Sequence, residues 1–532
     1  MNHSFHLRRV DIDFDREDQV DFHMPLWGFA QNQDFLLKRK RAAGVSSSIV
    51  KEFLVDKGPR PTIILAGSKG IGKSCESLFM VKALVDSDQG VIFEHGTERM
   101  LIVTQKALNL NRQDLDEVFA SYEEPYLERA GVYTFESHSE TFFRALCKGT
   151  SFVHIVDIGD NYKGTIDVEH SQIIISSPNS KTLKRSGELK PLMRYLDPWT
   201  RDELEHLNQC LPSSTQGHHL LVRKSPEDVK ELYNMFGGIP REVFANRTMR
   251  EAAELIKREV GNVALDVWEN VLTEPDYTRL PKMVPGVLVH ITRAEGNLCD
   301  VSFASKYVAK VVVRKFYRSQ RNKLFALANS VKGEKRLTAQ LRGEMLQQRM
   351  HEVLEHPCEL SITPLLNNGV RGTSRVLQVP RLTMKEFESN KLLDLQSLAE
   401  NDYCVALSSN FPSVESFFII KRRLLGIDED GLCVVGLQAT TASTHPVKRK
   451  GLKDIIKRCC ELLKSTLPLY VIFVTTPNGI QVRQSLGKRP ERFDDTVLQF
   501  ACTDVDFNEI LKALPGVSRS DDDSEEEEEE SE

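Results

Sequence analysis

The chain contains 532 residues, of which 40% are hydrophobic and 8% aromatic, enough to bury two or three separate cores. Its formal net charge of −6 arises from an acidic run near the end, and the rest of the chain is mildly basic. No apolar run approaches the roughly 18 residues of a membrane span, the N-terminus shows no secretory signal, and the ten cysteines show no zinc-type spacing. We therefore expect a chain from a reducing compartment, without a membrane span or a structural metal ion.

Residues 1–60 are polar and mixed in charge, and we expect them to form a leader packed on the first domain. Within this leader, Lys38, Arg39, Lys40 and Arg41 form a compact basic cluster of the nuclear-import type. A solvated patch at the start of the first domain explains the cluster equally well, so both interpretations stay open. At the other end, residues 515–532 predict a disordered acidic tail.

Residues 61–74 combine an apolar β-type run, Thr62–Ala66, with the Walker A pattern G-x-x-x-x-G-K-S. The glycines let backbone N–H groups approach a phosphate, Lys73 carries a positive charge to it, and the Ser74 hydroxyl suits Mg²⁺. A chance glycine-rich turn is the alternative, but the strand before and the helix after the pattern argue against it. We therefore expect ATP or GTP to bind here with Mg²⁺. The candidate residues are Gly67, Ser68, Lys69, Gly70, Ile71, Gly72, Lys73 and Ser74.

Three further residues of the first domain are candidates for acting on the bound nucleotide. Asp157 ends an apolar run, and an acid at the end of a neighbouring buried strand would hold water on Mg²⁺. Asp160 stands near the position of the glutamate that usually polarises the attacking water, so slow hydrolysis or none stays open. Arg241 follows Gly-Gly-Ile-Pro at a predicted helix start, from which its side chain would reach the nucleotide. Residues 172–179 predict a strand that ends in hydroxyl and amide groups able to sense the γ-phosphate.

The order of the elements predicts two α/β domains. Over residues 61–272, short apolar runs alternate with helical periodicity, which indicates a P-loop NTPase domain with a parallel sheet, helices on both faces and a helical C-terminal part. Prolines at 281 and 285 mark a boundary. A second α/β domain is expected over residues 286–514.

Several motifs of the first domain together resemble one family. The Walker A loop and Asp157 are followed by a Ser-Pro-Asn strand end, Tyr195-x-x-Pro-Trp-Thr and Gly237-Gly-x-Pro-Arg. This order over about residues 20–270 is similar to the P-loop domain of Crinkler effectors of oomycetes and chytrids and of retrotransposon-hot-spot proteins of trypanosomes. Secreted Crinklers carry a signal peptide and an N-terminal Leu-x-Leu-Phe-Leu-Ala-Lys pattern, and this sequence shows neither.

The resemblance implies that the second domain has a restriction-endonuclease-like fold. Gly343 to His351 is similar to the first helix of that family, residues 410–418 to its Asn-Phe-Pro-x-Val-Asp segment, and residues 432–440 to its Gln-x-Thr strand. A metal nuclease needs an acidic pair and a lysine to hold Mg²⁺; here Glu415 would bind the metal, whereas Gln438 is a neutral and poorer ligand. A His-Asn-His arrangement is the alternative. The nuclease candidates are His351, Asn410, Glu415, Gln438, His445 and Lys448.

A basic region precedes these motifs. From Lys306 to Arg349 the chain has twelve Lys or Arg residues and only two acids, with Phe316 and Tyr317 among the charges. This composition predicts either a solvated helix face or a surface on which cations neutralise DNA phosphates and aromatic rings meet bases or sugars. The candidate DNA contacts are Arg314, Lys315, Arg318 and Arg321.

Together these features predict an effector in which an ATP-binding module controls a nuclease-like domain that binds and cleaves DNA in the nucleus of a host cell. One alternative is an ATP-switched protein whose degenerate second domain binds DNA or chromatin without cleavage and alters transcription. Another is a signalling ATPase whose nucleotide state sets its assembly into an oligomer.

Overall fold

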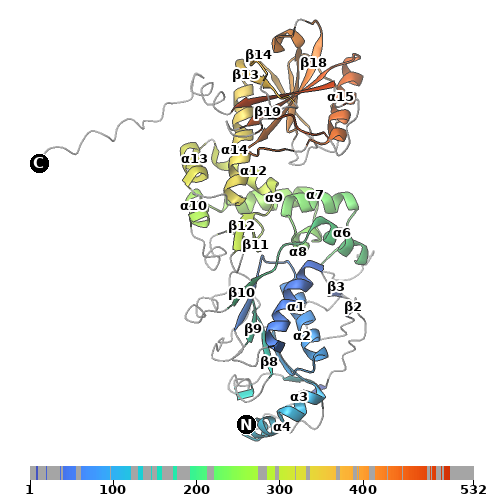
Figure 1. The fold of residues 1–532 in the computed structure, drawn as a ribbon, viewed down its shortest axis with the longest axis vertical. Coiled ribbons are helices and arrows are strands. Elements are labelled where there is room, and N and C mark those ends of the chain that lie inside the picture. Colours follow the sequence, from blue (N-terminus) through green and yellow to red (C-terminus); the bar gives the residue numbers. More distant parts are fainter. Residues whose placement is uncertain are drawn as a thin grey trace, which may run out of the picture. The chain divides into compact units, whose positions relative to one another are not determined.

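The fold is known from a computed structural model (Figure 1). It describes residues 8–9, 19–20, 36–37, 40–55, 62–95, 98–121, 130–135, 145–146, 152–158, 172–176, 192–211, 221–273, 284–293, 299–317, 319–330, 336–366, 372–387, 392, 395–406, 414–427, 429–445, 447–475, 480, 482–486, 493 and 496–503. The predicted acidic tail lies outside these residues, as does most of the predicted leader.

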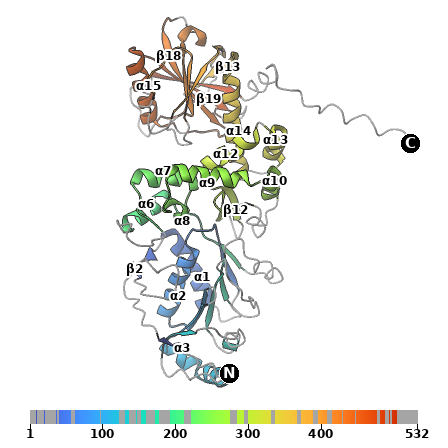
Figure 2. The same cartoon turned by 180° about the vertical axis from the view of Figure 1, so that it is seen from behind.

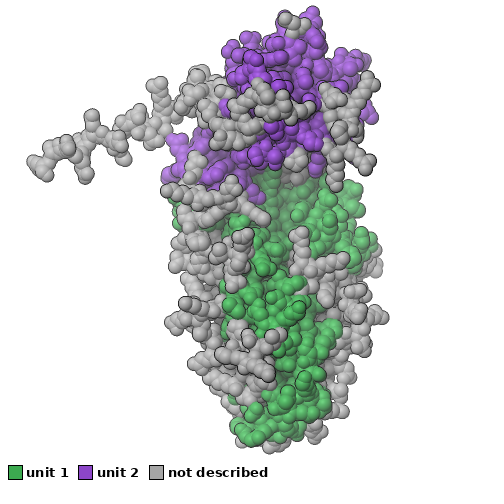
Figure 3. Space-filling view, viewed as in Figure 1, with its two compact units in different colours: residues 1–311, 329–337 green, residues 312–328, 338–532 purple. Residues whose placement is uncertain are grey.

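The chain divides into two compact units (Figure 3). Unit 1 comprises residues 1–311 and 329–337, and unit 2 comprises residues 312–328 and 338–532. The sequence predicted the boundary near residues 273–285. Unit 1 extends further because a hairpin beyond those prolines packs against its sheet, as strand β10 (Leu192–Tyr195) contacts strand β11 (Val289–Arg293).

Unit 1 is built on an 8-stranded sheet in the order β1-β7-β6-β5-β8-β9-β4-β10. Its parallel part confirms the predicted mixed α/β class with a parallel sheet, and every residue of the three strands β4, β8 and β9 is buried. This part comprises β5 (Val91–His95), β8 (Val153–Ile158), β9 (Gln172–Ser176), β4 (Ile63–Ala66) and β10.

The remaining strands of this sheet are antiparallel. They are β6 (Glu98–Val103), β7 (Gly131–Phe135) and β1 (Arg8–Arg9). The predicted parallel arrangement is therefore wrong for this part of the sheet. Only residues 96–97 separate β5 from β6, and a parallel crossover needs a dozen or more residues. A separate two-stranded sheet pairs β2 (Gln19–Val20) with β3 (Leu36–Leu37).

Helices α1 (Lys40–Val55) and α2 (Lys73–Asp86) lie side by side in both views of the chain (Figures 1 and 2). The Ser46 hydroxyl on α1 donates to the buried Glu76 carboxylate on α2 over 2.5 Å. Helices α3 (Gln105–Leu110) and α4 (Arg112–Ser121) follow β6.

The predicted helical part follows β10. From Pro240 onward the chain forms three successive helices, because the chain turns at residues 244–248 and Asn262 ends the second helix. The helices are α6 (Arg201–Cys210), α7 (Pro226–Phe236), α8 (Pro240–Val243), α9 (Met249–Gly261) and α10 (Leu265–Thr273). Strand β11 then pairs with β12 (Cys299–Phe303) in an antiparallel hairpin.

Unit 2 contains a second 8-stranded sheet in the order β14-β13-β20-β19-β18-β17-β16-β15. The strands are β13 (Cys358–Pro364), β14 (Arg375–Val379), β15 (Thr383–Phe387), β16 (Asp402–Ala406), β17 (Ser416–Lys421), β18 (Leu432–Thr440), β19 (Leu469–Thr475) and β20 (Val497–Thr503). The helices are α12 (Lys306–Tyr317), α13 (Arg321–Ser330), α14 (Arg336–Leu354), the short η3 (Arg422–Leu425) and α15 (Arg449–Leu463). Residues 306–311 of α12, 329–330 of α13 and 336–337 of α14 belong to unit 1.

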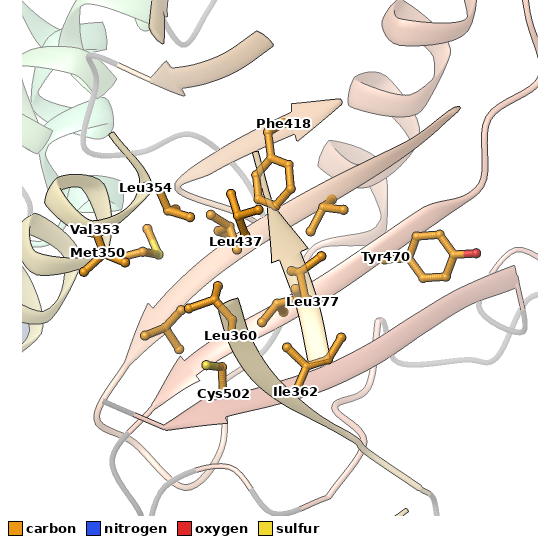
Figure 4. Close-up of a cluster of buried hydrophobic side chains, with 14 of the residues drawn as sticks. Met350, Val353, Leu354, Leu360, Ile362, Leu377, Phe418, Leu437, Tyr470 and Cys502 are labelled. Carbon is orange, nitrogen blue, oxygen red and sulfur yellow. The ribbon is translucent and has the colours of Figure 1, made fainter. Parts of the chain in front are cut away.

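Apolar cores lie on both faces of this second sheet. On one face, Met350 and Val353 of α14 pack toward Leu360 and Leu437 (Figure 4). On the other face, Leu452 and Ile455 of α15 pack with Phe417 and Val471. The mixed α/β class predicted for this part is therefore present, whereas its likeness to restriction endonucleases stays a prediction. None of the described helices is both long and apolar enough to cross a membrane.

Candidate nucleotide-binding site

The Walker A sequence forms a tight loop between β4 and α2. Gly70 and Gly72 have φ angles of 86° and 89°, in the left-handed region that favours glycine. Helix α2 begins at Lys73, and its N-cap residue Gly72 has no side chain to bond the first N–H groups. These groups and the positive end of the helix dipole therefore face the loop, which is the arrangement that binds phosphate.

The Lys73 side chain is held within this loop. It is only 7% exposed, and its Nζ donates to the carbonyl oxygens of Gly67 and Ser68, each over 2.9 Å. The ammonium group is thus fixed beside the backbone that would surround a phosphate, and little of it faces bulk water.

Asp157 lies at the same edge of the sheet but not on the neighbouring strand. It is opposite Ile175 of β9, which is in turn opposite Leu65 of β4. The expectation of a directly neighbouring strand is therefore wrong, because β9 lies between β8 and β4. Ser176, the last residue of β9, is fully buried between them.

The charge of Asp157 nevertheless acts on the start of α2. Burial raises the pKa of the Cys75 thiol to about 11, and the carboxylates of Asp157 and Glu76 add to the increase. Asp157 is 3% exposed, and its Oδ2 forms a hydrogen bond of 2.9 Å with Nδ1 of His95 on β5. The Ser74 hydroxyl and the Asp157 carboxylate offer the hard oxygen ligands that Mg²⁺ prefers, so this donor set fits the predicted ion.

Arg241 lies against the phosphate loop. A Cβ added to Gly70 would be 3.1 Å from Arg241 Cβ, so these two backbones pack closely. Trp199 joins the same elements, since its Nε1 donates to the Ile71 carbonyl over 2.8 Å and its backbone N–H donates to Gly238 over 2.9 Å. Of the other first-domain candidates, Asp160 lies outside the described residues.

Sequence reasoning gave no role to Trp199 or His95. Trp199 belongs to the Tyr-x-x-Pro-Trp motif, which was a usable signal for a residue near the loop. His95 carried no local signal, because its importance comes from the register that sets it opposite Asp157.

In unit 2, the structure brings Glu415 and Gln438 together. Ser416 is opposite Leu437, and this antiparallel register places Glu415 beside Gln438. Oε2 of Glu415 accepts a hydrogen bond from the Ala439 N–H over 3.1 Å. The backbone N–H of His445 donates to Gln484, Lys448 is the N-cap residue of α15, and Asn410 lies outside the described residues.

His351 belongs to a different buried cluster. Its Nδ1 is 2.5 Å from the Tyr403 hydroxyl, which is 3.1 Å from the Ser416 hydroxyl. Tyr403 packs with Leu437 on the α14 face of the sheet, and side chains alternate along a strand, so Gln438 points to the α15 face. Among the described residues, no group of three His, Cys, Asp or Glu side chains is placed to hold a metal ion.

The basic region uses several of its charged and aromatic residues internally. Phe316 and Tyr317 are buried, at 2% and 3% exposure, so the expectation that these rings meet bases is wrong. They belong to the apolar face of α12. The Arg321 guanidinium pairs with Glu352 at 3.2 Å and lies over the Tyr317 ring.

The remaining candidates of this region differ in their environments. Lys315 Nζ lies 4.5 Å from the centre of the Phe316 ring, and desolvation lowers the pKa of Lys315. Arg314 is exposed, and Arg318 lies outside the described residues. Of the basic cluster at residues 38–41, Lys40 and Arg41 begin α1, and Lys38 and Arg39 lie outside the described residues.

No protein-family model and no curated protein matches the chain. Among solved structures, the chain is similar to the ORC2 protein of Aeropyrum pernix, solved as ADPNP–ADP complexes, with a TM-score of 0.24 and 12% sequence identity. The match covers 52% of this chain and 94% of that chain. A similarity with so low a TM-score gives no information about function. The resemblance to Crinkler and retrotransposon-hot-spot proteins stays a prediction.

Proposed function

We propose that unit 1 binds a nucleoside triphosphate, ATP or GTP, with Mg²⁺. The observation that carries this proposal is the Walker A loop itself, with its left-handed glycines and with Lys73 held at 2.9 Å from two loop carbonyls. Ser74 and Asp157 supply oxygen ligands for Mg²⁺, and Arg241 supplies a cation beside the loop. The metal ion would neutralise phosphate charge, while Lys73 and the N–H groups at the start of α2 hold the phosphates in place.

Replacing Lys73 by alanine tests this proposal. We expect Lys73→Ala to lose ATP binding, because it removes the charge that is paired with the β- and γ-phosphates. Lys82→Ala is the matched control, since Lys82 lies on the same helix and pairs with Asp86 at 2.8 Å, away from the loop. Calorimetric titration with Mg·ATP and Mg·GTP measures both variants and the parent. Equal affinity in Lys73→Ala and the parent would contradict the proposal.

For unit 2, we propose a nuclease-like fold that binds DNA without cleaving it. The supporting observation is the state of its candidate metal ligands. The Glu415 carboxylate is bonded to a backbone N–H, its neighbour Gln438 carries no charge, and His351 is hydrogen-bonded to Tyr403 in a buried cluster. A nuclease site requires an acidic pair to hold Mg²⁺, and Glu415 is the single acid among the described residues at this end of β17 and β18. The effector role and the action in a host nucleus remain proposals that rest on the resemblance alone.

Plasmid nicking separates binding from cleavage. We expect the full chain to shift a DNA fragment on a native gel but to leave supercoiled plasmid intact with Mg²⁺, with or without ATP. Glu415→Ala should retain the gel shift. Mg²⁺-dependent nicking that disappears in Glu415→Ala would instead establish the cleaving alternative.

A further inference from the structure

The β11–β12 hairpin is joined to the phosphate loop by a buried hydrogen bond. The Ile291 N–H donates to the Ser68 hydroxyl over 3.0 Å, and both residues are 2% exposed. The Ile291 side chain packs with Ala66, the residue just before the loop, and with Tyr195. Two residues further on, the Arg293 N–H donates to Asp197 Oδ1 over 2.9 Å. The hairpin backbone is therefore connected to both segments that border the loop.

The neighbouring residue, His290, packs against the segment that carries Arg241. A Cβ added to Gly237 would lie 2.3 Å from His290 Cε1 and 2.3 Å from the Ala304 carbonyl oxygen. Gly237 thus fits closely between the two ends of the hairpin. His290 is 6% exposed, and its Nε2 has no hydrogen-bond partner among the described residues. The hairpin consequently touches the two elements that would surround a nucleotide, the phosphate loop and residues 237–241.

The same hairpin leads directly into helix α12. Ser305 is two residues beyond the end of β12, and its hydroxyl accepts a hydrogen bond from the Val308 N–H over 3.2 Å at the start of α12. The Ser305 hydroxyl also donates to the Met235 carbonyl over 2.7 Å, near the end of α7. The orientation of the first turn of α12 is therefore fixed by unit 1. Its later residues, 312–317, belong to unit 2.

We propose that the β11–β12 hairpin transmits the occupancy of the phosphate loop to helix α12. This inference rests on the proposed nucleotide binding. A bound phosphate attracts the Lys73 ammonium group, which is now bonded to the Gly67 and Ser68 carbonyls. Any resulting shift of Ser68 acts on the Ile291 N–H, because that donor is bonded to the Ser68 hydroxyl. A ligand can change the conformation of a distant element only if the contacts that connect them differ between the bound and the unbound state.

Two tryptophans report on the two ends of this route. Trp199 Nε1 is bonded to the Ile71 carbonyl in the phosphate loop. The Trp268 ring lies 5.2 Å from the Phe303 ring of β12. Fluorotryptophan incorporated into the full chain gives a fluorine NMR signal for each, assigned with Trp→Phe variants. The first signal follows the loop, and the second follows the hairpin.

The test compares two variants of Asp197 with the parent at saturating Mg·ATP. Asp197→Ala removes the side-chain acceptor of the Arg293 N–H, whereas Asp197→Asn keeps an oxygen at that position. We expect ATP to shift both fluorine signals in the parent and in Asp197→Asn. In Asp197→Ala, ATP should still shift the Trp199 signal, and the shift of the Trp268 signal should be smaller than in the parent.

Each other outcome counts against a specific claim. If Trp199 responds in the parent and Trp268 does not, the inference is overturned and nucleotide binding stands. A Trp268 response that is as large in Asp197→Ala as in the parent also overturns the route through β11. No binding by calorimetry and no response of either signal in the parent overturns the proposed function together with the inference.

Discussion

At the residue scale, His290 gives the fold of unit 1 a defined sensitivity to acid. Burial lowers the pKa of His290 from 6.5 to about 4, although a hydrogen bond to the Phe236 backbone opposes the shift. Below pH 6.5 the unfolded chain binds a proton at His290, and the folded chain binds it only near pH 4. Stability should therefore fall as the pH decreases from 6.5 towards 4, by up to about 3 kcal/mol.

Urea unfolding at several pH values measures this loss. All three tryptophans, at positions 27, 199 and 268, lie in unit 1, so their fluorescence follows that unit alone. His290→Gln cannot be protonated, and we expect its stability to depend less steeply on pH over this interval. Parallel curves for the parent and His290→Gln would show that another group is responsible.

The residues of the phosphate loop could be assigned from sequence because each has a local role. Gly70, Gly72 and Lys73 act through their own backbone or charge within a few residues of chain. Asp157 was found from its place after a buried strand, but the intervening β9 was not foreseen. His95 and Ile291 depend on strand register and on a distant hairpin, and neither property leaves a local pattern.

At the element scale, helix α9 depends on a capping box at its start. The Thr248 hydroxyl accepts a hydrogen bond from the Glu251 N–H over 3.3 Å, and the Glu251 carboxylate accepts one from the Thr248 N–H over 2.7 Å. Replacing Thr248 by alanine should lower the free energy of unfolding of unit 1 by about 1 kcal/mol. Thr248→Ser retains the hydroxyl and should lose much less.

The same tryptophan-monitored urea unfolding measures this effect. Arg250→Ala, an exposed position on the same helix, is the control for a change that leaves the cap intact. A Thr248→Ala variant as stable as Arg250→Ala would mean that the cap contributes nothing to this unit.

In unit 2, buried strands and exposed edge strands differ in their sequences. β17, β18 and β19 are almost entirely buried and read as continuous apolar runs. β15, by contrast, lies at the edge of the sheet, and most of its side chains are exposed. An exposed edge strand needs no apolar run, so its pairing with β16 could not be read from composition.

At the scale of the whole molecule, the sequence predicted two α/β parts but misplaced their division. Prolines mark where the chain turns, and they were taken to mark where one core ends. The core of unit 1 continues beyond them, because Ile291 and Phe303 of the hairpin are buried with residues of that unit. A boundary follows the burial of side chains, which depends on contacts that are distant in sequence.

The division of the chain between the units also has a consequence for how such a protein can evolve. The chain crosses from one unit to the other at residues 311/312, 328/329 and 337/338, so no single break in the gene separates them. A recombination event at any one crossing would give each product an incomplete unit and would divide a helix, α12, α13 or α14. Recombination that replaces one of the two units should give a folded protein only when residues 306–354 are inherited together. We therefore expect the two units to remain joined in one protein while the sequence of each unit changes.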